Sequence, residues 1–183
     1  MLFRSCLPCA SAQIVEAHGK QLMGWAEISN ANVGSSAVAE YWNFSDKGAS
    51  EGTATAQGMK IVAAPADHAY LDQKYNDSTP LGLNWAGDIS VEDAYAWDPT
   101  DGGRATDSQL LGVEAPLWSE TLHSISDIEY MAWPRMAGIA EIGWTPQGER
   151  AWSTYAPRLA QQGPRWTQLG VNFFRSPDVP WAP

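Results

Sequence analysis

The chain has 183 residues, of which 44% are hydrophobic and 17% charged, which is the ordinary composition of a globular domain with a sizeable core. Its formal net charge of −10 argues against binding to nucleic acid or to an anionic membrane surface. No apolar run in these residues reaches the length of a transmembrane helix.

The first residues, Met1 to Ser5, are predicted to be a non-native leader. The codons GTG-CTC-TTC-CGA-TCT, read from a GTG start, encode these five residues, and that DNA matches the end of a common sequencing adapter. Cys6 and Cys9 follow with C-x-x-C spacing, but no thioredoxin-like pattern surrounds them. Two cysteines alone make a poor zinc site, which needs four ligands, and we expect no metal.

Four short apolar runs, each bounded by turn residues, are typical of buried parallel strands. They are Leu22–Ile28, Ala37–Asn43, Lys60–Ala64 and Leu110–Ala115. A longer segment follows each run, which indicates βα units. Helical composition precedes the first run over Ser11–Lys20, and Ala49–Gly58 is interpreted as a weak helix or a loop.

The segment 65–109 is long for a connection, and loops of this length are usually functional or disordered. Trp85 and Trp97 indicate that this one is ordered. Asp127–Trp144 is predicted to be helical, capped by Ser126 or Asp127 and kinked at Pro134. A second helical stretch, Glu149–Leu169, is expected to be interrupted at Pro157 and at Gly163-Pro164. The tail Val171–Phe174 is expected to be a short strand or arm.

Aromatic and acidic residues follow the ends of the predicted strands. They are Trp25 and Glu27, Tyr41 and Trp42, Tyr70 and Asp72, and Trp118 and Glu120. In a (β/α)₈ barrel the active site lies at that end of the strands. Indole rings stack on the apolar faces of sugars, and carboxylates accept hydrogen bonds from hydroxyls. The pattern favours a sugar pocket, although Trp side chains that fill the core and acids that line a solvated rim would give the same spacing.

Longer stretches carry a resemblance to family 20 glycoside hydrolases, the β-N-acetylhexosaminidases. They are Ala64–Asp72 with Tyr75, Pro80 and Leu81–Trp85; Gly112–Thr121; and Met131–Arg135 with Ala140–Pro146. Motifs of this length are far more specific than a lone short pattern. The resemblance runs from about Gly19 to Ser176-Pro177. It implies an α/β fold, the C-terminal half of a (β/α)₈ TIM barrel with about four βα units and C-terminal helices. We expect the partial barrel over 6–150 and a helix and tail packed on it over 151–183.

The resemblance also implies roles for individual residues. This family uses the substrate's own 2-acetamido carbonyl as the nucleophile, an exception among retaining glycosidases. By resemblance, Tyr70 positions the acetamide oxygen, Asp72 binds the 6-hydroxyl and Glu120 the 4-hydroxyl. Trp25, Trp42 and Trp118 wall the acetamide, and Trp85 stacks on the next sugar. The implied ligands are N-acetylhexosamine-terminated glycans, including chitin fragments, with no cofactor. Glu114 and Glu141 are interpreted as structural.

The family's adjacent Asp-Glu catalytic pair is expected before Gly24, where this sequence has none. We therefore expect a fragment that lacks the acid/base and has little or no activity by itself. It would pair with the missing N-terminal half-barrel or with a second copy, because a half-barrel exposes strand edges. Two alternatives remain open: a non-catalytic GlcNAc-binding half-barrel and a structural remnant. A secreted or periplasmic parent is expected by resemblance, while the sequence itself leaves the compartment open.

Overall fold

The computed structural model describes residues 3–31, 33–100 and 105–181, and Met1 and Leu2 of the expected leader lie outside them. The chain divides into two compact units. The first consists of Met1–Pro65 and Pro99–Gly112, and the second of Ala66–Asp98 and Val113–Pro183. Among the described residues, no helix is long and apolar enough to cross a bilayer.

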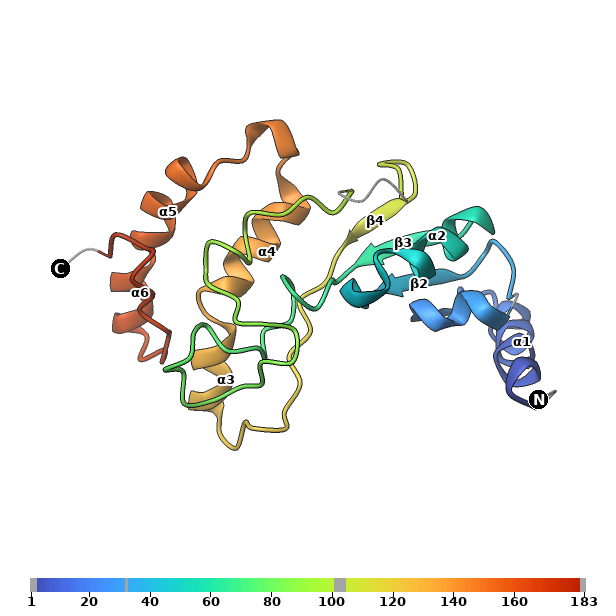
Figure 1. Ribbon diagram of the computed structural model, residues 1–183, viewed down its shortest axis with the longest axis horizontal. Helices are drawn as coiled ribbons and strands as arrows, with labels where there is room; N and C mark the ends of the chain where they lie inside the picture. The colour runs from blue at the N-terminus through green and yellow to red at the C-terminus, as the bar shows by residue number, and fades with distance from the viewer. Residues whose placement is uncertain (1–2, 32, 101–104, 182–183) are drawn as a thin grey trace. The chain divides into compact units, whose positions relative to one another are not determined.

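A four-stranded sheet with the order β1-β2-β3-β4 forms the frame of the first unit (Figure 1). Its strands are β1 (Met23–Trp25), β2 (Val38–Tyr41), β3 (Lys60–Ala63) and β4 (Leu110–Val113, whose last residue belongs to the second unit). Strands β1, β2 and β3 are parallel, and Gly24, Ala39 and Ile61 lie side by side. Each apolar run predicted to be a strand contains one of these four, so the predicted α/β fold with a parallel sheet is confirmed.

One helix precedes the first strand of this unit, and short helices lie between the strands that follow. They are α1 (Phe3–Ala17), the 3₁₀ helices η1 (Ala26–Ala31) and η2 (Phe44–Asp46), and α2 (Ala49–Ala56). Helix α1 begins earlier than the expected Ser11 and continues through Pro8. Its end agrees with the prediction, because Gly19 adopts a φ of 65° and donates its N–H to the Glu16 carbonyl at 2.9 Å.

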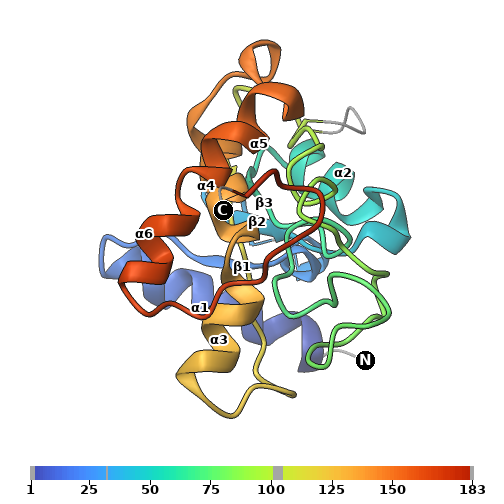
Figure 2. The same cartoon turned by 90° about the vertical axis from the view of Figure 1, so that its left-hand side faces the viewer.

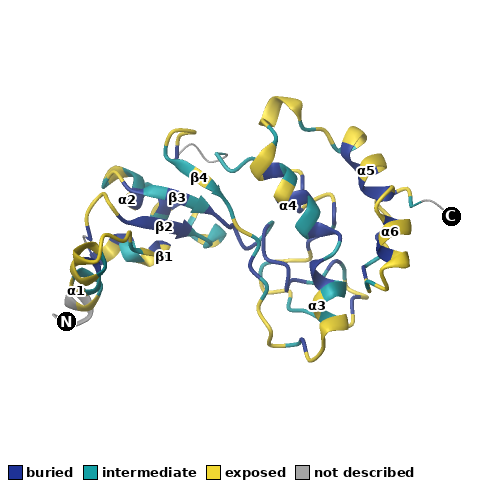
Figure 3. Cartoon of the chain, turned by 180° about the vertical axis from the view of Figure 1, so that it is seen from behind, coloured by how far each residue is buried: buried dark blue, intermediate teal, exposed yellow. Residues whose placement is uncertain are grey.

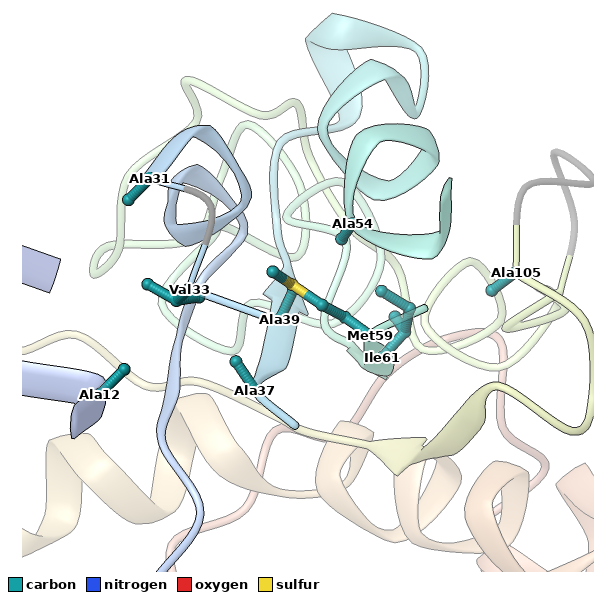
Figure 4. Close-up of a cluster of buried hydrophobic side chains, with 9 residues drawn as sticks. All are labelled: Ala12, Ala31, Val33, Ala37, Ala39, Ala54, Met59, Ile61 and Ala105. Atoms are coloured by element: carbon teal, nitrogen blue, oxygen red, sulfur yellow. The ribbon is translucent and has the colours of Figure 1, made fainter. Parts of the chain in front are cut away.

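One face of the sheet packs against these helices. Side chains alternate between the two faces of a strand, so Ala39 and Ile61 face the helices while Val38 and Glu40 point to the opposite face. Figure 4 shows the resulting apolar cluster, which consists of Ala12, Ala31, Val33, Ala37, Ala39, Ala54, Met59, Ile61 and Ala105. Small side chains dominate this cluster, which lets the helices approach the strands closely.

The second unit has no strand of its own beyond the end of β4 in its described residues, and it combines helices with long irregular segments. Its helices are α3 (Ile125–Ala132), α4 (Arg135–Trp144), η3 (Gln147–Glu149), α5 (Trp152–Ala160) and α6 (Gly163–Gln168). The described part of 65–109 contains neither helix nor strand, only an isolated parallel bridge between Gln73 and Leu83. This segment is ordered through many turns, as the buried Trp97 predicts.

The expected single kinked helix over Asp127–Trp144 is wrong, because α3 and α4 are separate helices. Trp133 has an extended backbone, with φ −98° and ψ 133°, as steric contact with the following proline ring favours. The predicted cap is wrong too. The Ser124 side chain caps α3 by accepting the Asp127 N–H at 3.2 Å, which satisfies one of the amides at the helix start.

The C-terminal segment folds back on the helices of this unit. Helix α5 continues through the exposed Pro157, where no break occurs, because the Ser153 carbonyl that lacks its helical N–H partner lies at an exposed position. The tail Val171–Phe174 is an arm and not a strand; it runs back past α6 (Figure 2), and the Phe174 N–H donates to the Trp133 carbonyl at 3.0 Å. Helices α3 to α6 each bury one side and expose the other (Figure 3).

Candidate functional site

Two Trp residues predicted for the site lie at the C-terminal ends of neighbouring strands in the first unit. Trp25 is the last residue of β1, and Trp42 comes directly after β2. The Trp42 indole N–H donates to the Glu27 carboxylate, at 3.0 Å to Oε1 and 3.3 Å to Oε2. Glu27 therefore fixes the orientation of the Trp42 ring. Sequence reasoning noticed Glu27 only as an acid at a strand end and missed this contact.

The loops that follow β3 and β4 are joined in the second unit by a backbone hydrogen bond. The Leu71 N–H donates to the Pro116 carbonyl at 2.8 Å. Tyr70 and Asp72 flank Leu71 in sequence, and Trp118 follows shortly after Pro116. The sequence left open whether Tyr70 and Asp72 lie in a loop or alternate along a strand; they lie in the loop that follows β3, which ends at Ala63.

An aromatic group surrounds Tyr70. Its ring meets the Trp85 ring edge-on, with centroids 5.9 Å apart, and lies tilted against Trp118 at 6.4 Å. Tyr70 is only 4% exposed, whereas the side chains of Trp85 and Trp118 are 50% and 43% exposed. The group thus presents two indole surfaces to solvent beside a buried phenol. Such surfaces suit stacking on the apolar face of a sugar ring.

Asp72 places a buried carboxyl group next to these rings. It is 2% exposed, and its Oδ1 accepts the Trp118 backbone N–H at 3.4 Å. Its Oδ2 accepts a hydrogen bond from the Gln73 side-chain amide at 3.0 Å. Burial raises the pKa of Asp72, hydrogen bonds from its own backbone N–H, from Trp118 and from Gln73 oppose this, and the charge of the exposed Glu120 raises the pKa further. The carboxyl is oriented by donors on both oxygens.

The buried Arg135 side chain binds the backbone of the loop that carries Tyr70 and Asp72. The Arg135 guanidinium donates to the carbonyls of Leu71 at 2.6 Å, Ile89 at 3.1 Å and Met131 at 3.2 Å. It also lies 3.9 Å above the centroid of the Tyr75 ring. Burial lowers the pKa of Arg135. Because Leu71 lies between Tyr70 and Asp72, this side chain holds the backbone that presents both.

Gly82 lets a second loop approach the first. It adopts a φ of 88°, and a Cβ atom there would lie 2.6 Å from both the Asp72 carbonyl oxygen and the Met131 Cε. Its N–H donates to the Thr121 hydroxyl at 2.8 Å, and the Leu83 N–H donates to the Asp72 carbonyl at 2.8 Å. These contacts bring the segment that carries Trp85 against the loop that carries Asp72.

The structure brings together five of the seven predicted site residues within the second unit: Tyr70, Asp72, Trp85, Trp118 and Glu120. Trp25 and Trp42 belong to the first unit. Sequence reasoning missed Gln73 and Arg135 as supports of the site. The signal for Arg135 was a lone arginine within an apolar stretch, since such a charge must find buried partners.

Glu141, which was interpreted as structural, makes its contacts with other side chains of the second unit. It accepts hydrogen bonds from the Arg158 guanidinium, at 2.8 and 2.5 Å, and from the Tyr95 hydroxyl at 3.0 Å. The Arg158 hydrogen bond is the main cause that lowers the pKa of Glu141. In the part of the chain that is described, no cluster of three or more His, Cys, Asp or Glu residues could hold a metal ion.

A family model for the glycosyl hydrolase family 20 catalytic domain matches residues 8–147. A β-N-acetylhexosaminidase of Cellulomonas fimi is 38% identical over 173 residues, 93% of this chain and 35% of that protein. The solved N-acetyl-β-hexosaminidase of Streptomyces plicatus, in complex with Thio-NAglucal, is 42% identical with a TM-score of 0.88, covering 93% of this chain and 35% of that one. The exo-β-N-acetylglucosaminidase of Vibrio harveyi, in complex with N-acetylglucosamine, is 29% identical with a TM-score of 0.82, covering 93% and 27%. This chain therefore spans about a third of the length of these relatives.

Proposed function

Because the chain belongs to glycosyl hydrolase family 20, we propose that it supplies sugar-binding residues of a β-N-acetylhexosaminidase, an exo-hydrolase that releases terminal β-linked GlcNAc or GalNAc. The observation that carries this proposal is the group formed by Tyr70, Asp72 and Trp118. It combines a buried phenol, a buried and oriented carboxyl group and an exposed indole within one unit.

The residue types match the chemistry of a substrate-assisted mechanism. The acetamide carbonyl of the substrate attacks its own anomeric carbon, so the protein must hold the acetamide in place. In this proposal the Tyr70 hydroxyl donates to the acetamide oxygen and Trp118 packs against the acetamide. Asp72 and Glu120 accept hydrogen bonds from the 6- and 4-hydroxyls, and Trp85 stacks on the next sugar.

Three further parts of the proposal rest on the family resemblance. We propose that Trp25 and Trp42 also contact the acetamide, with Glu27 holding the Trp42 ring. Chitin fragments are among the proposed substrates. The partner is proposed to be the remaining part of the barrel or a second copy of this chain.

In the 183 residues no Asp is followed directly by Glu, and the adjacent acids Glu92-Asp93 have the reverse order. We propose that the acid/base carboxylate and its acidic neighbour come from a part of the catalytic domain outside these residues. The chain by itself then binds an N-acetylhexosamine without hydrolysing its glycosides. This observation equally favours the second candidate function, a non-catalytic GlcNAc-binding half-barrel, which differs only in having no catalytic partner.

The test is thermal unfolding of the purified chain with a thiazoline that mimics the oxazoline intermediate. Saturation to about 100 times the Kd should stabilise the fold by about 2.7 kcal/mol. Tyr70→Phe removes one hydroxyl and should weaken thiazoline binding about fivefold, as expected for one hydrogen bond. Tyr130→Phe, a partly buried tyrosine on α3, is the matched control and should leave the thiazoline shift unchanged.

A chromogenic β-GlcNAc substrate separates binding from turnover. We expect no hydrolysis above the buffer rate with the chain alone. A thiazoline shift that Tyr70→Phe leaves intact would contradict the role of Tyr70, and the absence of any shift would contradict a formed sugar site.

A further inference from the structure

The buried Gln73 side chain both donates and accepts a hydrogen bond beside the candidate sugar site. It follows Asp72 directly in sequence and is 0% exposed. Its Nε2 donates to the Asp72 Oδ2 at 3.0 Å, and its Oε1 accepts the Ala86 N–H at 3.2 Å. A buried amide so placed contacts the carboxyl group of its own neighbour and links their loop to the segment that contains Ala86.

At its donor end, Gln73 fixes the carboxyl plane of Asp72. The Trp118 N–H holds Oδ1 at 3.4 Å, and the amide holds Oδ2. Each carboxylate oxygen has two lone pairs, so the Trp118 N–H and the Gln73 amide do not by themselves exhaust the acceptor capacity of the group. With donors on both oxygens, the carboxyl group cannot rotate without losing a hydrogen bond in a buried setting, which is costly.

At its acceptor end, Gln73 holds the backbone next to Trp85. The segment that carries Trp85 is also tied by backbone bonds from Leu83 N–H to the Asp72 carbonyl at 2.8 Å and from Ile89 N–H to the Lys74 carbonyl at 2.7 Å. The hydrogen bond from the Ala86 N–H to the Gln73 side chain lies between these two backbone hydrogen bonds in sequence. It therefore restrains the part of the loop where the half-exposed Trp85 indole meets Tyr70 edge-on.

We propose that Gln73 is a positioning residue that couples Asp72 to Trp85, so that recognition of the terminal sugar's 6-hydroxyl and stacking on the second sugar depend on the same buried amide. This inference rests on the proposed function of the site. The coupling role of Gln73 differs from a purely structural role in its effect on the ratios between sugar affinities. A structural role lowers every sugar affinity by the same factor, whereas coupling lowers the preferences contributed by Asp72 and Trp85.

The test measures two affinity ratios by titration calorimetry with GlcNAc, 6-deoxy-GlcNAc and N,N′-diacetylchitobiose. The preference for GlcNAc over 6-deoxy-GlcNAc reports on Asp72, and the preference for the disaccharide over GlcNAc reports on Trp85. Gln73→Met removes both hydrogen bonds and should reduce each ratio about fivefold.

The matched control is Gln109→Met in the first unit. Gln109 also bridges two segments, donating to the Thr55 carbonyl at 3.3 Å and accepting the Thr106 N–H at 3.2 Å. Its loss should leave both ratios unchanged. Equal losses of affinity for all three sugars in Gln73→Met would overturn the coupling.

A second readout requires no sugar. In chain labelled with 5-fluorotryptophan, the Trp85 ¹⁹F resonance is assigned by its loss in Trp85→Phe. We expect this resonance to shift or broaden in Gln73→Met and to remain in place in Gln109→Met. Wild-type chain that binds no sugar would refute the proposed function, and the ¹⁹F result would still decide the inference: an unchanged Trp85 signal in Gln73→Met overturns it.

Discussion

Arg135→Met replaces a buried guanidinium by an apolar side chain of comparable length and tests how the site loop is held. The substitution leaves the carbonyls of Leu71, Ile89 and Met131 without the donors that now lie at 2.6, 3.1 and 3.2 Å. Leaving buried carbonyls without their charged donor is expected to lower the free energy of unfolding by about 3–5 kcal/mol. For a protein of this length, that loss corresponds to a fall in Tm of about 6–20 °C.

Urea unfolding monitored by circular dichroism measures the effect, and Arg165→Met is the control. Arg165 is exposed on α6, so its replacement should change the unfolding free energy by less than about 0.5 kcal/mol. Arg135→Lys keeps the charge but lacks the planar fork that contacts several carbonyls, so its loss should fall between the two. An Arg135→Met chain within about 1 kcal/mol of wild type would refute the view that this side chain holds the loop.

Two further predictions concern Asp72 and Gly82. Burial raises the folded-state pKa of Asp72, so its proton is bound more tightly in the folded chain than in the unfolded chain. The unfolding free energy of wild type relative to Asp72→Asn should therefore fall as the pH rises above about 4. Urea unfolding measures this difference, and a difference that grows between pH 4 and 7 would contradict the prediction. Gly82→Ala adds a Cβ 2.6 Å from the Asp72 carbonyl oxygen, whereas Gly87→Ala, at a φ of 101°, meets nothing within 4 Å. Thermal unfolding should show Gly82→Ala to be the more destabilising by about 1–3 kcal/mol, and equal losses would exclude the steric contact as the cause.

The elements that were predictable from the sequence are those that local patterns encode. The apolar runs around Ala39 and Ile61 are buried strands because short β-forming stretches between turn residues have few other ways to bury their side chains. Boundaries were less predictable. The first strand ends at Trp25, because the chain turns into the 3₁₀ helix η1, and α3 is capped by Ser124 at a position where three polar residues compete for the role.

The arrangement of the candidate site was not predictable from local pattern, because long-range contacts create it. No sequence periodicity indicates that the Leu71 N–H binds the Pro116 carbonyl, yet this bond determines that Trp118 lies beside Asp72. The same holds for Gln73, whose partner Ala86 is set by loop folding and not by spacing. The residues themselves were identified through their resemblance to a family, which carries long-range information that composition and periodicity do not.

These contacts also indicate how the site is stabilised. The Tyr70–Asp72 loop is fixed by three hydrogen-bond partners within the second unit. The Pro116 carbonyl accepts a hydrogen bond from the loop, and the side chains of Gln73 and Arg135 donate to it. A parallel strand would present alternate residues to opposite faces, whereas this loop is held by side chains and backbone that approach it from several segments. Its geometry therefore depends on buried polar partners and less on the sheet. Substitutions at Arg135 should accordingly impair sugar binding even though that side chain contacts no proposed ligand.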